Sequence, residues 1–160
     1  MPTAAFTIDI REITRLADSL GRASGKIVRD ELTTAMDKST MHVVTSSRAR
    51  VNNKTGNYSN SFQRQTKVSA SGVLGIITNA AKSSTGFVYA ASLEWGRRGF
   101  SAIKAKALRF EIGGVVIFAK SVGPAPAQHI MEYGARDAEP RINAEFDAAR
   151  DRIAAKLERV

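Results

Sequence analysis

Two histidines and one isolated glutamate are the side chains most suited to chemistry. His42 lies inside a predicted helix and His129 follows a proline-containing turn, so they are far apart and form neither an H-x-x-x-H nor an H-E-x-x-H pattern. We interpret both as ordinary helix or interface residues. No phosphate-binding glycine loop or dinucleotide fingerprint is present. The candidate glycines fall in predicted turns or strands instead: Gly72, Gly75, Gly96 and Gly99. The sequence therefore predicts no metal and no cofactor.

Glu94 is the single acidic residue in an otherwise apolar stretch and precedes Trp95. A buried carboxyl with a raised pKa can act as a general acid. The alternative, which we favour, is that Glu94 caps backbone amides or pairs with an arginine. No second carboxylate, serine-histidine pair or cofactor motif accompanies it, so we expect no enzymatic activity.

Trp95 and Tyr89 have two interpretations. At helical spacing they are typical of core aromatic residues, which is the interpretation we favour, whereas burial in a subunit interface would make them strong anchors. The basic segment that follows is suited to phosphate contacts. It lacks the interleaved aromatics of single-strand binders and the helix-turn-helix of duplex readers, so a solvated loop is favoured. Its residues are Arg97, Arg98, Lys104, Lys106 and Arg109.

Composition predicts one globular domain over residues 1–160, because this length is enough to bury a sizeable core. No apolar run approaches the roughly 20 residues of a membrane helix, and no signal-peptide pattern opens the chain, so we expect a soluble protein made in the cytoplasm. Without cysteine, stability depends on packing or assembly. The formal charge of +9 favours DNA, RNA or an acidic protein surface as partner, although a solvated basic surface is an equal alternative.

The periodicity of apolar residues predicts helices at both ends of the chain. Spacings of three and four indicate an amphipathic helix over 10–24 and, after a break at Ser24-Gly25, a longer one from Ile27 to about Arg50. Near the other end we predict a short helix over 127–133 and a long C-terminal helix that begins near Pro140.

The middle of the chain alternates with period two and predicts two antiparallel hairpins. The first joins 62–68 to 73–78, and the second joins 108–112 to 115–119 through Gly113-Gly114. Between them we predict a short helix that opens at 83–86 and ends at Gly96, followed by a mobile basic loop over about 97–106. The fold class is therefore α+β: helices packed on an antiparallel sheet, with two hairpins and a long C-terminal helix.

Several segments, in order, resemble the phage tail-component, or neck, family that includes many minor tail proteins. KTG at 54–56 with Tyr58 and Ser61 resembles its TG-hydrophobic-x-x-Ser element, and YAASLEWG at 89–96 resembles its YA-x-x-hydrophobic-Glu-aromatic-Gly element. The second hairpin, the Pro126-Ala127 step and the last helix complete a match over about 10–158. Trp95, Arg97 and His129-Ile130 depart from the commoner residues and leave the branch of the family open.

The resemblance implies a virion structural protein in the neck or upper tail, assembled in the host cytoplasm, that forms a homo-oligomeric ring of about six copies and lets DNA pass through. Expected partners are copies of itself, other neck, connector or tail-tube proteins and the DNA, with no membrane. A tail terminator or head-completion stopper is the nearest alternative, and a small basic nucleic-acid-binding protein is the alternative of another class.

A closed ring needs two unlike faces on each subunit. We expect the segment around Glu94 and the 106–120 hairpin to form much of the contact between neighbours. The interface candidates are Thr55, Gly56, Tyr89, Ala90, Glu94, Trp95, Gly96, Arg97, Arg98, Phe110 and Phe118. The candidates for facing DNA or an acidic partner are Lys104, Lys106 and Arg109.

Overall fold

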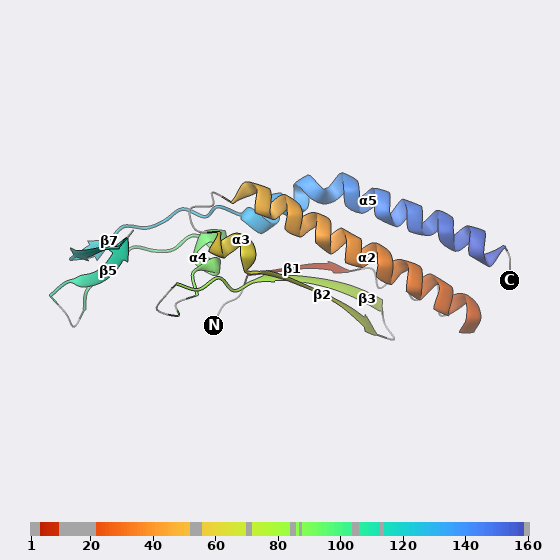
Figure 1. Cartoon of the computed structure of the whole chain (residues 1–160), viewed down its shortest axis with the longest axis horizontal. Helices are drawn as coiled ribbons and strands as arrows, with labels where there is room; N and C mark the ends of the chain where they lie inside the picture. The colour runs from red at the N-terminus through yellow and green to blue at the C-terminus, as the bar shows by residue number, and fades with distance from the viewer. Residues whose placement is uncertain are drawn as a thin grey trace.

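The computed structural model describes residues 4–9, 22–51, 56–69, 72–83, 86, 88–103, 106–112 and 114–158. Two long helices, α2 (Arg22–Arg50) and α5 (Ile130–Leu157), lie side by side, and α2 covers a three-stranded antiparallel sheet (Figure 1). Two small two-stranded sheets project from one end of this body. The predicted α+β fold, with two hairpins and a long C-terminal helix, is confirmed.

The two long helices run antiparallel and share an apolar face. Val28, Leu32 and Met36 of α2 are buried, and Phe146 and Ile153 of α5 pack against the cluster that they form. The helices approach closely near Gly134, where a β-carbon would lie 2.7 Å from the Cα atom of Ser47. A larger side chain there would push the two backbones apart.

The predicted helix break at Ser24-Gly25 is wrong, because both residues lie inside α2. A glycine inside a helix costs about 1 kcal/mol relative to alanine, which packing along the continuous helix offsets. Of the helix predicted over 10–24, residues 10–21 lie outside the described residues. Residues 22–24 belong to α2. Residues 4–9, which precede the predicted helix, form strand β1 (Ala4–Asp9), which we did not predict.

The sheet contains the first predicted hairpin, formed by β2 (Phe62–Ser69) and β3 (Gly72–Asn79), and its strand order is β1-β3-β2. In β3 the residues that face α2 are fully or almost fully buried, among them Val73 and Ile77. A β-carbon on Gly75 would lie 2.6 Å from the sulfur of Met36, so this glycine lets the sheet approach α2. Strand β2 forms one edge of the sheet and is exposed along most of its length.

Two short helices lie between these elements. Helix α3 (Asn57–Asn60) follows Gly56, whose positive φ of 71° is a conformation that glycine adopts readily. Helix α4 (Ala90–Trp95) ends at Gly96 as predicted, but it does not open at 83–86. Val88 forms a β-bridge with Lys82, and this extended pairing delays the helix until Ala90.

The second predicted hairpin, β5 (Leu108–Ile112) and β6 (Val115–Ala119), is confirmed with the expected register. Gly114 has a positive φ of 81°, while Gly113 lies outside the described residues. The hairpin belongs to a projection, residues 97–125, that we call the arm; the rest of the described chain is the body (Figure 1).

The structure corrects the prediction of a mobile loop over 97–106, because the first part of this segment is paired. Arg97 forms a bridge with Ala125, and β4 (Phe100–Ser101) pairs with β7 (Ser121–Val122). The N–H of Ala102 then donates to the Lys120 carbonyl at 3.0 Å. Backbone pairing thus extends through residue 102, whereas residues 104–105 lie outside the described residues.

A single helix replaces the two predicted after residue 127. Helix α5 runs from Ile130 to Leu157 with Pro140 inside it. A proline in a helix interior loses one hydrogen bond and costs about 3 kcal/mol in isolation. Buried residues on both sides of it, such as Ala138 and Ala149, show that core packing keeps the helix continuous. None of the described helices is both long and apolar enough to cross a membrane.

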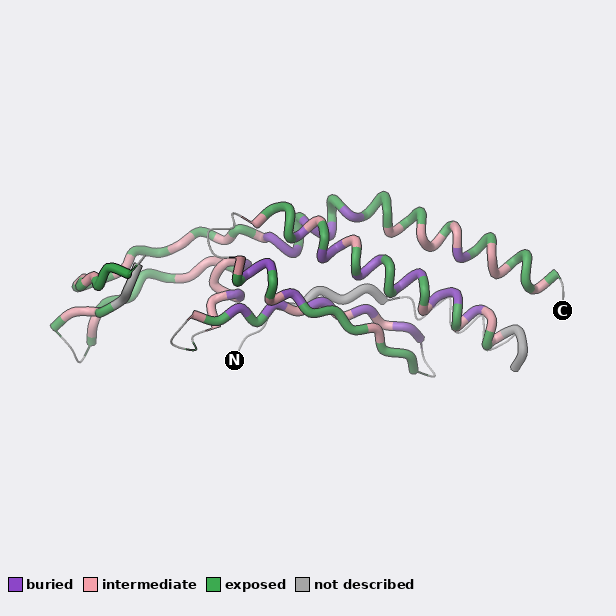
Figure 2. The backbone as a smooth tube through the Cα atoms, viewed as in Figure 1, coloured by how far each residue is buried: buried purple, intermediate pink, exposed green. Residues whose placement is uncertain are grey.

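Burial is concentrated in the body. Figure 2 shows buried segments along α2, β3 and the start of α5, whereas the arm is intermediate or exposed at 97–103, 106–109 and 114–125. The larger core cluster joins Val43 and Val44 of α2 to Tyr58, Ile77 and Ile130. The core therefore stops at the base of the arm.

Candidate interaction surface

The junction between α4 and α5 is organised by Glu94. Its carboxylate accepts hydrogen bonds from the N–H groups of Met131 (3.0 and 3.1 Å) and Glu132 (3.2 Å). These amides belong to the first turn of α5, where backbone N–H groups have no partner within the helix and a negative charge is favourable. His129, the residue before α5, provides no side-chain cap. The prediction that Glu94 caps backbone amides is confirmed.

Tyr58 lies in the same buried region. Burial raises the pKa of its hydroxyl well above the ordinary range, and the charge on Glu94 adds to that rise. The hydroxyl therefore stays protonated at physiological pH. Its ring packs edge-on against Phe62, with ring centroids 5.4 Å apart. These contacts are typical of a packed core around a capping carboxylate.

Other residues of the YAASLEWG segment also hold the junction together. Ala90 is fully buried, and the Tyr89 hydroxyl accepts a hydrogen bond from the Asn57 amide at 3.1 Å. A β-carbon on Gly96 would lie 2.7 Å from the carbonyl oxygen of Ala125, where the chain returns from the arm. Four of the interface candidates thus make contacts within the subunit: Tyr89, Ala90, Glu94 and Gly96.

Trp95 is 54% exposed, so the interpretation of this residue as core is wrong. Consecutive helical residues point about 100° apart, and the inward position of Glu94 leaves the indole outside. Tyr89, by contrast, is partly buried against the core, as predicted. The spacing identified an amphipathic turn but could not tell which of two neighbouring residues faces inward.

The arm carries most of the exposed large apolar side chains of the described chain. Ile103 is 95% exposed and Phe118 is 66% exposed. The others in the arm are Phe100, Val115 and Val116. Trp95 adjoins the base of the arm, and the body contributes only Met41, Val68 and Tyr133. Such a concentration on one projection is typical of a protein interaction surface.

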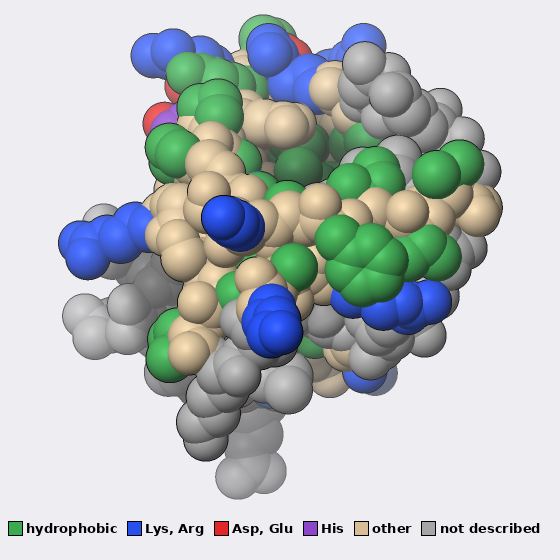
Figure 3. All heavy atoms as spheres, turned by 90° about the vertical axis from the view of Figure 1, so that its left-hand side faces the viewer, with side chains coloured by type: hydrophobic (Ala, Val, Ile, Leu, Met, Phe, Trp, Pro, Cys, Tyr) green, Lys and Arg blue, Asp and Glu red, His purple; other side chains and the backbone are tan. Residues whose placement is uncertain are grey.

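The arm is also basic. Its sequence holds six lysines and arginines against one acidic residue, Glu111. Arg98, Lys106, Arg109 and Lys120 are exposed and have no acidic partner among the described residues. Seen from the arm end, apolar and basic side chains lie intermixed, and acidic ones show only near the rim (Figure 3).

The remaining candidates have mixed positions. The guanidinium of Arg97 lies over the Phe100 ring, 5.2 Å from its centroid, at the base of the arm. Phe110 lies in β5 opposite Ile117, on the same hairpin as Phe118. Thr55 and Lys104 lie outside the described residues. Arg97, Arg98 and Phe118 thus belong to the arm, Trp95 ends α4 at the base of the arm, and Gly56 precedes α3 in the body.

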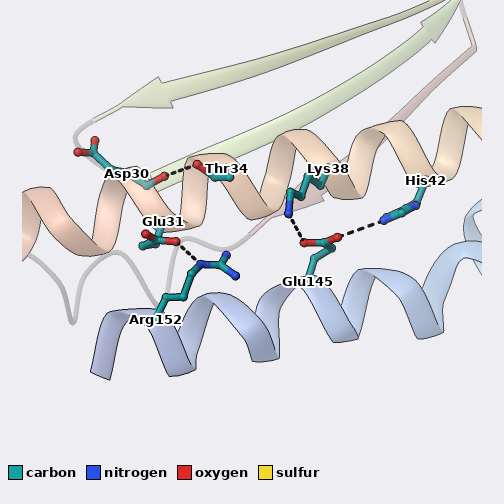
Figure 4. Close-up of polar contacts among 7 residues, drawn as sticks. All are labelled: Asp30, Glu31, Thr34, Lys38, His42, Glu145 and Arg152. Atoms are coloured by element: carbon teal, nitrogen blue, oxygen red, sulfur yellow. Dashed lines mark hydrogen bonds and ion pairs between the residues drawn. The ribbon is translucent and has the colours of Figure 1, made fainter. Parts of the chain in front are cut away.

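Ion pairs join the two long helices away from the arm. Glu31 receives hydrogen bonds from Arg152 (2.7 Å) and Lys156 (2.6 Å), which lower the pKa of its carboxyl. Glu145 contacts Lys38 at 3.2 Å and His42 at 3.4 Å (Figure 4). His42 therefore has a structural contact, and no group of three potential ligands in the described residues is placed to hold a metal ion.

No protein-family model matches this chain, and neither curated proteins nor solved structures provide a match.

Proposed function

We propose that this chain is a non-enzymatic structural subunit of a long-tailed phage. In this proposal it forms a ring at the head-tail junction or upper tail that joins or completes the tail and lets DNA pass. The observation that carries the proposal is the pairing of a well-packed body with an arm whose apolar side chains are exposed. A two-stranded hairpin is only marginally stable alone, so an arm of this kind is suited to packing on another molecule.

The sequence resemblance supplies the biological context. The YAASLEWG segment forms the junction from which the arm leaves the body, so the residues that resemble the family also determine where the arm begins. The arm at one end of the subunit and the body at the other provide two unlike surfaces, and a cyclic head-to-tail assembly requires two such surfaces.

Imaging tests the proposal at two levels. Electron microscopy of the purified chain is expected to show closed rings with a central opening, about six copies each. Reconstruction of particles of the phage that encodes it is expected to trace this chain between the head and the tail. Particles that lack the polypeptide would overturn the proposal. The level at which the ring lies would separate a neck or completion protein from a tail terminator or a head-completion stopper.

The basic arm also supports a second candidate, a small nucleic-acid-binding protein. Binding through lysine and arginine contacts to phosphate weakens steeply as salt increases. A monomeric chain that binds duplex DNA with such salt dependence, and that does not associate with heads or tails, would favour this candidate over the ring.

A further inference from the structure

In the proposed ring, the arm of one subunit packs on the body of another. The distribution of charge on the body indicates which of its surfaces suits a basic arm. The exposed edge of the sheet, β2, carries Lys67 and Arg64, and Arg64 pairs with Asp37 of α2. Positions 38–93, which include all of β2 and β3, contain no aspartate or glutamate. Like charges in contact cost free energy, so Lys67 disfavours a basic arm, and β2 itself offers no carboxylate to attract one.

The C-terminal half of α5 has the opposite character. On its solvent side Asp147 and Asp151 share one cation, Arg150, at 3.1 and 3.2 Å. The basic residues nearby, Arg152 and Lys156, are bound to Glu31 of α2 and so are not available to balance these carboxylates. On this solvent side of the helix, Asp147 and Asp151 thus outnumber the one cation that they contact.

Small side chains lie beside these carboxylates. Ala144, Ala154 and Ala155 are exposed on α5, which allows aromatic and branched side chains to approach the helix closely. The arm presents such side chains next to unpaired cations, for example Phe118 beside Lys120. The two surfaces are complementary both in charge and in the size of their apolar groups.

Arm and receiving surface lie at opposite ends of the elongated subunit (Figure 1). The arm therefore cannot reach the C-terminal half of its own α5. We propose that the arm of one subunit docks on the C-terminal half of α5 of a second copy. Apolar side chains of the hairpin lie against the exposed alanines in this contact, and its cations face Asp147 and Asp151. The inference rests on the proposed ring and names the surface that receives the arm.

Disulfide crosslinking tests the contact directly, because the chain contains no cysteine. One protein carries Val115→Cys in the arm, and a second, differently tagged protein carries Ala155→Cys in α5. The matched control replaces the second protein with Gln65→Cys on the edge strand β2. We expect several-fold more mixed disulfide with position 155 than with position 65. Equal yields, or preference for position 65, would overturn the inference.

Charge reversal provides an independent test in the full chain. The arm variant is K106E/R109E and the helix variant is D147K/D151K. Each variant alone is expected to be monomeric by light scattering, and an equal mixture is expected to recover the wild-type oligomer, because every contact then joins opposite charges again. Asp30→Lys, an exposed α2 substitution, is the control and is expected to assemble normally.

The results separate this inference from the proposed function. If D147K/D151K still forms rings, α5 does not receive the arm, and the ring proposal stands while the inference fails. If K106E/R109E assembles normally but loses affinity for DNA, the arm faces nucleic acid and the inference fails again. If the arm crosslinks to α5 but phage particles lack the chain, the inference stands and the virion role fails.

Discussion

The body and the arm differ in what stabilises them. In the body, Met36, Val43 and Ile77 are fully excluded from solvent between α2 and the sheet. In the arm, no residue whose burial the structure describes (97–103, 106–109 and 114–125) is buried, and the two small sheets are held by backbone pairing. The body therefore contains the apolar core, whereas the arm leaves most of its large apolar side chains exposed. In the proposed ring, stability and assembly are therefore encoded in separate parts of this chain.

Truncation of matched strand residues should give the largest contrast between the two regions. Ile77→Ala removes a fully buried side chain and leaves a cavity, so we expect the free energy of unfolding to fall by about 2–5 kcal/mol. Ile117→Ala in β6 is the control, since Ile117 is only partly buried, and its loss should be much smaller. Urea denaturation followed by circular dichroism measures both. Equal losses would mean that the arm contributes to the core.

Removal of the Glu94 carboxylate should produce a smaller loss at the boundary between the regions. Glu94→Ala leaves the amides of Met131 and Glu132 without their acceptor, which should cost about 1–3 kcal/mol. Glu139→Ala, on the exposed side of α5, should change stability by less than about 0.5 kcal/mol. Thermal unfolding measures both variants. An unchanged melting temperature for Glu94→Ala would show that another group caps α5.

The ion pairs of the body should make its stability depend on pH. The folded-state pKa of Glu31 lies below its ordinary value of 4.5, so the carboxylate stabilises the fold above that pH, and the contribution is lost as pH falls through the lower folded-state value. Glu31→Gln should therefore cost about 1 kcal/mol at pH 7 and progressively less in acid. Denaturation at pH 7 and below pH 4 measures the difference. A cost that is constant with pH would contradict this assignment.

Local patterns in the sequence predicted most of the fold but not its long-range pairings. The hairpin at 108–119 followed from alternation and two glycines, and α2 followed from helical periodicity. The edge strand β1 was missed because its partner, β3, is about 70 residues away in the chain. The helix through Pro140 was missed for a related reason, since the packing that overrides the proline comes from a distant element.

The candidate surface was predicted less completely than the fold. The capping role of Glu94 followed from one acid in an apolar stretch. The exposure of Trp95 could not be predicted in this way, because the sequence does not show which of two adjacent residues of a short helix faces the body. The exposed apolar residues Phe100 and Ile103 were not predicted as part of the surface, because the prediction of a loop rested only on the cations of this segment. Phe100, Ala102 and Ile103 are apolar residues set among those cations, and they were the signal that this segment is more than a solvated loop.

Substitutions at the arm and its base should have the smallest effect on stability and a large effect on assembly. Trp95→Ala and Phe118→Ser replace exposed side chains, so the free energy of unfolding should change by less than about 0.5 kcal/mol. Because Phe118 lies in the arm and Trp95 lies at its base, light scattering should show that oligomers are reduced or lost. Met41→Ala, which removes an apolar side chain that is 46% exposed on the body, should leave both properties unchanged. Unfolding of the isolated Trp95→Ala protein would instead assign the indole to the core and remove the distinction between the two regions at the base of the arm.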